Sequence, residues 1–141
     1  MCLHIKATKS GRKPKPKIAK EDIVVYKRIK RRTNRSLHRD FPYQPGKRYR
    51  VAKMELVRSE HDTYIGLTGF HSFKEITGFS SIRPCPPQNA PLGSKLVVFI
   101  IPKGTRYYEG TTNGYEDSPG YISQAIRAGD LNAVRKIKGT K

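Results

Sequence analysis

Six consecutive apolar residues at 96–101, between Lys95 and Pro102, constrain the fold more than any other segment. The run is far shorter than the roughly 18 apolar residues of a membrane-spanning helix. It is rich in β-branched residues and does not alternate with polar ones, which is typical of a strand covered on both faces. We therefore expect a central β-strand at 96–101, a turn at 102–105 and a shorter strand at 106–110.

Other strands are predicted from composition and from turn residues. Residues 23–29 are rich in β-branched side chains and predict a strand. The Pro-Gly pair at 45–46 predicts a turn, because Pro fixes one φ angle and Gly tolerates a positive φ at the next position. Residues 47–57 predict another strand. A bulge or strong twist is expected near Ala52, where the apolar residues change from odd-numbered to even-numbered positions. A last strand is expected at 132–137.

Two segments carry helix signals. A Ser followed three residues later by a Glu has capping-box spacing and predicts a short helix at 72–78. Residues 118–128 combine Ser118 as N-cap, Pro119 at the first helical position and Gly129 beyond the end. The sequence thus predicts an α+β fold: one compact domain with a mixed, mostly antiparallel sheet and two short helices.

The charge is large and unevenly distributed. The chain has 29 Lys and Arg against 11 Asp and Glu, a net charge of +18. Residues 1–58 hold 19 of these basic residues and 4 acidic ones. The first cluster, at 6–17, has almost no apolar residues and contains Gly and Pro. We therefore expect residues 1–21 to be an extended, flexible basic arm that contributes little to folding, followed by a domain at 22–141.

The second cluster, at 27–39, has seven basic residues and no acidic one. It is either a solvated surface that aids solubility or a contact surface for a polyanion. The polyanion would be nucleic acid or the acidic face of a partner protein, including one in a multi-subunit assembly. No signature of a sequence-specific reader accompanies the charge. The candidate polyanion-binding residues are Arg12, Lys13, Lys15, Lys17, Lys27, Arg28, Lys30, Arg31, Arg32, Arg35 and Arg39.

Signals of catalysis are weak. No nucleophilic triad, phosphate-binding loop or metal-ligand spacing is visible, so we expect no catalytic residue, no cofactor and no metal. Four residues are possible ligand contacts: His71, Tyr107, Tyr108 and Glu109. The simpler interpretation is a half-buried, hydrogen-bonded His71, with one tyrosine in the core and one on the surface. The alternative for the two tyrosines is a stacking wall for a base or nucleotide.

Three segments resemble bacterial mono-ADP-ribosyltransferases. They are Tyr-Gln-Pro-Gly at 43–46 with Tyr49, Gly-Phe-His-Ser-Phe at 69–73, and the strand and turn at 97–105. That family has a Gly-Phe-x-Ser-Thr-Ser strand entering a helix, and a later strand that ends in Leu-Leu-Pro-x-Gly-Thr. The resemblance implies a compact split-sheet α+β core.

The same resemblance implies that the transferase chemistry is missing. The family's catalytic glutamates precede the Pro-x-Gly-Thr turn, where this chain has Leu96 and Val98. An apolar side chain cannot stabilise an oxocarbenium-like centre. Glu109, which follows the turn, is the carboxylate that a divergent enzyme would use if the hairpin returned it to the start of the strand.

The chain is also similar to small uncharacterised open reading frames of bacteriophages and gut bacteria, over residues 1–3, 18–27, 69–73 and 101–110. This similarity implies a phage or mobile-element origin. We expect a non-enzymatic, phage-type interaction protein in the host cytoplasm or the virion, without a membrane partner. The alternatives are a virion structural or capsid-associated protein, an inhibitor of a host defence system, and a divergent ADP-ribosyltransferase-like enzyme.

Overall fold

The computed structural model describes residues 3–6, 13–36, 41–58, 63–74, 94–112 and 118–134. These residues form one antiparallel sheet, in the order β4-β11-β8-β3-β7-β10-β9-β1-β6-β5, with β2 added to β9. The strands are β1 (Leu3–Lys6), β2 (Lys17–Ile18), β3 (Ile23–Lys30), β4 (Arg48–Arg50), β5 (Glu55–Arg58), β6 (Thr63–Thr68), β7 (Phe70–Phe73), β8 (Ser94–Ile101), β9 (Arg106–Thr112), β10 (Ser118–Ser123) and β11 (Ala125–Ala128).

The expectation of an α+β fold with a mixed sheet and two short helices is wrong. The described residues contain no helix, and every strand pair among them is antiparallel. The segment 118–128 forms β10 and β11 instead of a helix. In the segment 72–78, Ser72 and Phe73 belong to β7, Lys74 follows the strand, and the rest lies outside the described residues.

Neighbouring strands explain why 118–128 is extended despite its helix signals. β10 pairs with β7 on one side and β9 on the other, and β11 lies between β4 and β8. Tyr121, Ile122 and Ser123 are consecutive and all buried, whereas a surface helix buries only one stripe. Gly129 permits a close backbone approach, because a Cβ there would lie 2.7 Å from the Val98 carbonyl oxygen.

The strands and the turn expected from the apolar pattern are present. β8 includes the predicted 96–101 and lies between β3 and β11, and β3 includes the predicted 23–29. The expected strand at 47–57 is interrupted at 51–54, where β4 ends before β5 begins. In the turn at 45–46, Gly46 has a φ of 73°.

A strand is expected at 132–137, but the described part of this segment is not a strand. Residues 132–134 lie outside the strands, although the Val134 N–H donates to the Leu96 carbonyl oxygen at 2.7 Å. The remaining residues of that segment lie outside the described ranges.

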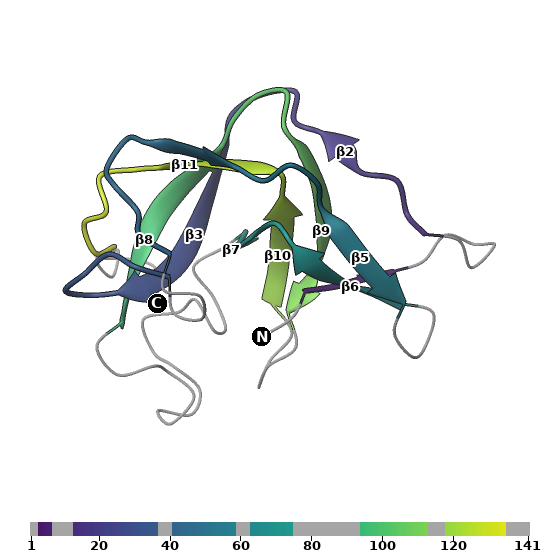
Figure 1. Cartoon of the computed structure of the whole chain (residues 1–141), viewed down its shortest axis with the longest axis horizontal. Coiled ribbons are helices and arrows are strands. Elements are labelled where there is room, and N and C mark those ends of the chain that lie inside the picture. Colours follow the sequence, from purple (N-terminus) through teal and green to yellow (C-terminus); the bar gives the residue numbers. More distant parts are fainter. Residues whose placement is uncertain are drawn as a thin grey trace, which may run out of the picture.

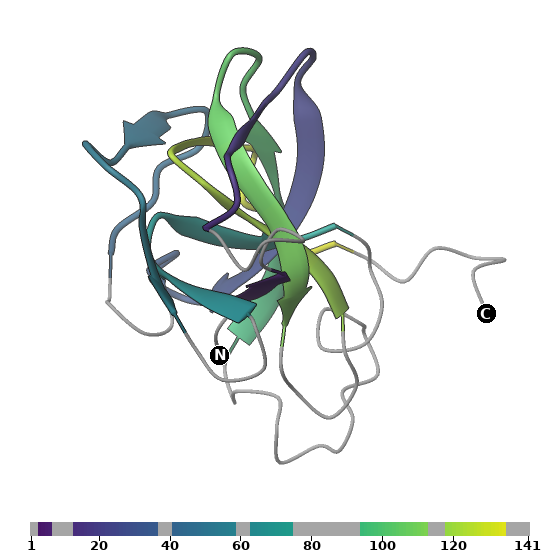
Figure 2. The same ribbon diagram turned by 90° about the vertical axis from the view of Figure 1, so that its right-hand side faces the viewer.

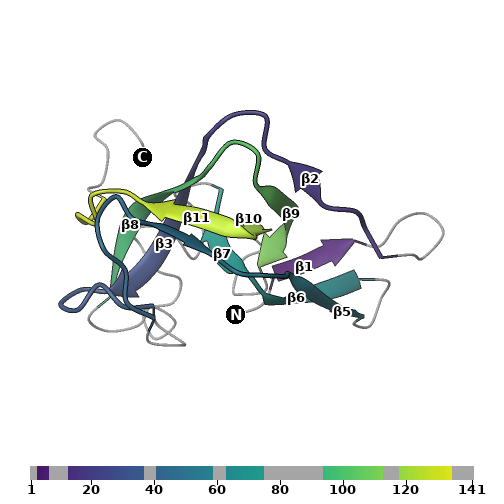
Figure 3. The ribbon, with the colours of Figure 1, turned by 45° about the horizontal axis from the view of Figure 1, so that its top comes forward.

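Two bent strands join the halves of the sheet. β6 and β7 are separated only by Gly69, which has a φ of 139°, and β10 and β11 only by Gln124. β6 pairs with β1 and β5, whereas β7 pairs with β10 and β3. In Figures 1 and 3, β11, β8 and β3 form one half and β9, β1, β6 and β5 form the other, with β7 and β10 between them.

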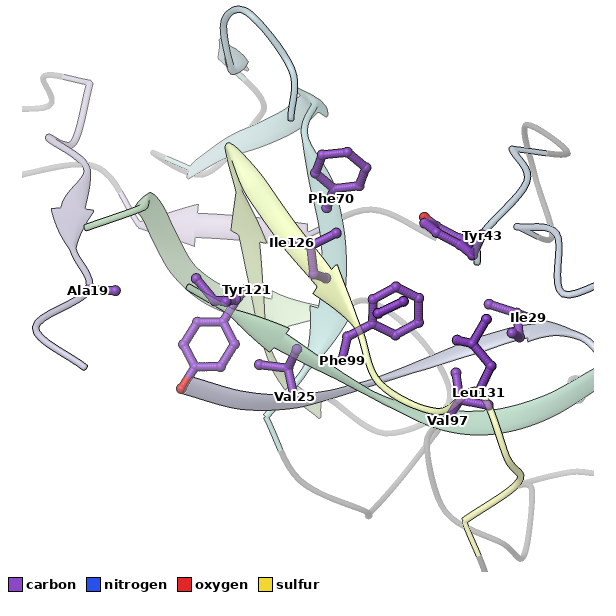
Figure 4. Packing of buried hydrophobic residues seen from close by; sticks show 12 residues of the cluster. Ala19, Val25, Ile29, Tyr43, Phe70, Val97, Phe99, Tyr121, Ile126 and Leu131 are labelled. Atoms are coloured by element: carbon purple, nitrogen blue, oxygen red, sulfur yellow. The ribbon is translucent and has the colours of Figure 1, made fainter. Parts of the chain in front are cut away.

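Each half has its own cluster of buried side chains. The larger cluster lies around Phe99, whose ring contacts the Tyr43 ring edge-to-face at 4.8 Å between centroids. Figure 4 shows Phe99 surrounded by side chains from several strands, including Ile126 from β11 and Val97 from its own strand. The smaller cluster consists of Ile5, Tyr108 and Ile122, with Met54 and Leu56 packed against it.

The segment expected to be a basic arm has both of its described ends in the sheet. β1 lies between β6 and β9, and the Ile5 side chain is only 4% exposed. β2 pairs with β9, and Ala19 forms backbone hydrogen bonds with Gly104 and Thr105. The loop at 19–22 and the turn at 102–105 therefore lie side by side, at the top of Figures 1 and 2. The division into an arm and a domain stays a prediction, but Ile5 is part of the core.

The first prediction tests the contribution of β1 to stability. Ile5→Ala should lower the free energy of unfolding by about 2 to 4 kcal/mol, because it removes buried methyl groups from the smaller cluster. The measurement is chemical denaturation. Ile18→Ala is the control: this isoleucine is 60% exposed, so its replacement should have little effect. Equal stability of both variants would mean that the Ile5 side chain contributes nothing to folding.

The second prediction tests the packing of Ile122 against two glycines. A Cβ at Gly66 would lie 2.5 Å from Ile122 Cδ1. Gly66→Ala should therefore destabilise the fold by about 1 to 3 kcal/mol. Ile122→Val removes the Cδ1 atom, so the double variant should lose less stability than the two single variants added together. Strict additivity in the double-mutant cycle would show that this contact does not limit the packing.

Candidate polyanion-binding surface

The candidate basic residues do not form one patch. Arg12 and Arg39 lie outside the described residues. Lys13 and Lys15 are exposed and precede β2, whereas Arg31 and Arg32 are exposed in the turn after β3. Figures 1 and 3 place β2 and the end of β3 at opposite ends of the molecule. The expected arm and the expected loop are therefore two separate basic regions.

Lys17 is already paired with an acidic residue. Its Nζ lies 3.0 Å from Oε1 of Glu109, on the neighbouring strand β9. The hydrogen bond and the charge of Glu109 raise the pKa of Lys17. Since the Lys17 side chain is 61% exposed and the Glu109 side chain 37%, such an ion pair contributes little to stability. Lys17 is thus a weaker candidate for an external anion than Lys13 and Lys15.

Lys27 points into the fold instead of onto the basic surface. Strand residues alternate between faces, and Lys27 shares a face with Val25 and Ile29, which have no exposed surface. Its Nζ donates to the backbone oxygen of His71 and lies 6.0 Å from the centroid of the Phe99 ring. Burial lowers the pKa of Lys27 from 10.5 to about 8.

Two arginines after Lys27 are engaged with the first residue of β8. Arg28 Nη1 donates to the Ser94 hydroxyl at 3.2 Å, and Arg31 Nη2 donates to the Ser94 backbone oxygen at 3.3 Å. Burial and the nearby charge of Arg31 lower the pKa of Arg28. Lys30 and Arg35 are half-buried. Within the described part of this cluster, Arg31 and Arg32 are the most exposed cations.

A tight hairpin presents Arg31 and Arg32. The Asn34 N–H donates to the Lys30 carbonyl oxygen at 3.0 Å, and Asn34 has a φ of 56°, a conformation that Asn tolerates better than most residues. The Lys30 N–H donates to the Arg35 carbonyl oxygen at 2.8 Å, which closes the hairpin. The two arginines thus sit on a turn whose ends are fixed by backbone hydrogen bonds.

The sequence prediction missed a second basic group next to this hairpin. The group contains Lys47, Arg48, Arg50 and Lys53, all of them exposed. The segment 41–54 has no acidic residue and contains three aromatic residues besides these four cations. That combination of positive charge and aromatic residues is the sequence signal that could have identified the group.

The four candidate ligand-contacting residues lie on two different faces of the sheet. Tyr107 contacts Tyr121 edge-to-face at 5.5 Å, and Glu109 shares their face. Tyr108 belongs to the other cluster, and His71 shares its face through Ile122, their common cross-strand neighbour. Burial raises the pKa of Tyr108. The structure therefore does not bring the two tyrosines together as a stacking wall.

Glu109 does not return to the start of β8. In the sheet, β3, β7 and β10 lie between β8 and β9. Leu96 is buried in β8 and Val98 is half-buried, while Glu109 contacts Lys17 and lies 3.9 Å from Lys74. The described residues therefore do not place Glu109 where a divergent enzyme would need it.

The same residues contain no cluster of three or more His, Cys, Asp or Glu side chains suited to a metal ion. No helix within the described ranges has the length and apolar character needed to cross a membrane. The sequence matches no protein-family model, and neither a curated protein nor a solved structure matches it.

The third prediction concerns the pH dependence of stability. Between pH 8 and 10.5 the unfolded chain keeps the Lys27 proton that the folded chain has lost, so Lys27 makes the free energy of unfolding rise with pH in this window. Lys27→Met removes this contribution and should raise stability at pH 7 by up to about 3 kcal/mol. Lys103→Met, in an exposed turn, is the control. An identical pH profile for wild type and Lys27→Met would contradict the buried placement of the amine.

Proposed function

We propose that the chain is a non-enzymatic interaction protein that binds a polyanion through exposed cations, chiefly those of the hairpin at 30–36. The observation that carries the proposal is the exposure and the unpaired charge of Arg31 and Arg32 within the described part of the chain. Both are exposed, and neither forms an ion pair with any residue in the described ranges. Fixed like charges close together repel one another, and a bound anion relieves that repulsion.

The exposed lysines before β2 supply a separate point of attachment. Lys13 and Lys15 also form no ion pair within the described part of the chain. Their distance from the hairpin favours an extended polyanion, since a small anion cannot reach both regions. Contacts of this kind depend strongly on salt, because each neutralised phosphate releases counterions.

The fourth prediction tests the hairpin. Arg31→Ser/Arg32→Ser should weaken binding of the full chain to fluorescent oligonucleotides and reduce the slope of log K against log salt by about 1.4 to 1.8 for two lost phosphate contacts. The measurement is fluorescence anisotropy over a range of salt concentrations.

Lys103→Ser/Arg106→Ser is the matched control, since it removes two exposed cations from a different part of the surface. Equal weakening by both double variants would mean that only net charge matters. If the wild-type chain binds neither oligonucleotides nor polyglutamate in a salt-dependent way, the proposed function is wrong and the charge serves solubility.

A further inference from the structure

An exposed aromatic ring lies beside the second basic group. Phe41 is 39% exposed, although it is a large apolar side chain. Its ring contacts Tyr43 at 5.3 Å, Tyr49 at 5.2 Å and Phe70 at 6.3 Å between centroids, each time edge-to-face. Three aromatic neighbours hold the ring in place while part of it meets solvent. A ring held in this way can offer a stacking surface at little cost in side-chain entropy.

The neighbours of Phe41 are themselves fixed. Tyr43 is buried and packs against Phe99 in the larger core cluster. The Tyr49 hydroxyl accepts a hydrogen bond from the Gln44 N–H at 2.6 Å. The Lys47 ammonium lies 5.7 Å from the centroid of the Tyr49 ring. The aromatic cluster therefore links the exposed ring both to the core and to the exposed cation of Lys47.

Edge strand β4 places two more cations on one face. Arg48 and Arg50 are two residues apart in the strand, so both point away from the side taken by Tyr49. Arg48 lies directly opposite Arg127 of β11, and like charges in that position repel each other. Arg127 has Asp22 within 3.7 Å, whereas Arg48 has no ion-pair partner within the described ranges. A bound anion would give Arg48 the partner charge that Asp22 gives Arg127.

Backbone hydrogen bonds join this region to the hairpin. The Tyr43 N–H donates to the Asn34 carbonyl oxygen at 3.1 Å, and the Ser36 N–H donates to the Phe41 carbonyl oxygen at 2.8 Å. Arg35 and Pro42 form an antiparallel bridge. The hairpin, the exposed ring and edge strand β4 are thus neighbours, and we call this region the β4 surface. Its cations and ring are Arg31, Arg32, Phe41, Lys47, Arg48, Arg50 and Lys53. Arg48 and Arg50 lie on the face of β4 opposite Tyr49 and Phe41, at the open edge of the sheet.

We propose that the β4 surface binds single-stranded nucleic acid, with a base stacked on Phe41 and phosphates held by the hairpin cations, by Lys47 and, around the open edge of the sheet, by Arg48 and Arg50. This inference rests on the proposed function and makes it more specific. Base stacking on an aromatic ring needs an unpaired base, whereas the bases of a duplex already stack on one another. An acidic protein surface would use the cations but would give the exposed ring no such role.

The experiment measures binding of the full chain to fluorescent oligo(dT) and oligo(U). An abasic oligomer of equal length, a duplex and polyglutamate serve as the other probes. Phe41→Leu should weaken binding to oligo(dT) and oligo(U) about tenfold, since one stacked base is lost. The affinity of Phe41→Leu for the abasic oligomer should equal that of the wild-type chain. Phe41→Tyr should keep the affinity, and the melting temperature of each variant shows whether it is folded.

The cations are tested in the same assay. Arg48→Ser/Arg50→Ser should weaken binding to oligo(dT) and to the abasic oligomer alike, and should reduce the salt slope by about 1.4. The controls are Ile18→Ala for an exposed apolar side chain and Lys103→Ser/Arg106→Ser for two exposed cations elsewhere.

The outcomes separate the two proposals. Salt-dependent binding that Phe41→Leu leaves unchanged would overturn the stacking inference and leave the proposed function standing. Equal loss on abasic and normal oligomers would show that Phe41 acts only through structure. Tighter binding to the duplex or to polyglutamate than to single strands would also overturn the inference. Absence of salt-dependent binding to every probe would overturn both proposals.

Discussion

The shared strand at 118–128 holds the two halves of this sheet together. Its first part, β10, pairs with β7 and β9, and its second part, β11, pairs with β8 and β4 of the other half. Ile122 has no exposed surface and lies against Gly66 within β6 and Gly69 at the bend between β6 and β7. Side chains at either glycine would push the two bent strands apart. The smaller core cluster, to which Ile122 belongs, therefore depends on a branched side chain packed against two glycines.

Local sequence patterns predict the elements whose conformation is set by their own residues. The apolar run of β8 and the β-branched run of β3 predict strands because β-branched side chains pack well on a pleated sheet. Positive φ at Gly46 and Gly104 follows from turns that need glycine at those positions. The prediction of a helix at 118–128 was wrong, because Gly129 at its expected end serves another purpose. Gly129 is required by the close approach of Val98, a contact across strands that no local pattern reveals.

Which of the candidate basic residues are exposed could be predicted from the sequence only in part. The exposure of Arg31 and Arg32 agrees with the density of positive charge, but Lys27 faces the core. Its position could have been found from the sequence, because the parity of Val25 and Ile29 places Lys27 on the same side of a strand. The edge position of β4 could not have been found in this way. It depends on pairing with β11, a strand that the sequence had suggested to be a helix.

Burial and hydrogen bonding redistribute the charge of the cluster at 27–39. Lys27 is turned inward, and Arg28 donates to Ser94 from a partly buried position. The cations left at the hairpin tip are few, so the most basic part of the sequence supplies only part of the basic surface. The rest comes from the β4 segment, which carries less charge in sequence but keeps it exposed. Since that segment also presents Phe41, the surface combines charge with a stacking ring, and this combination distinguishes a candidate nucleic-acid surface from a merely soluble one.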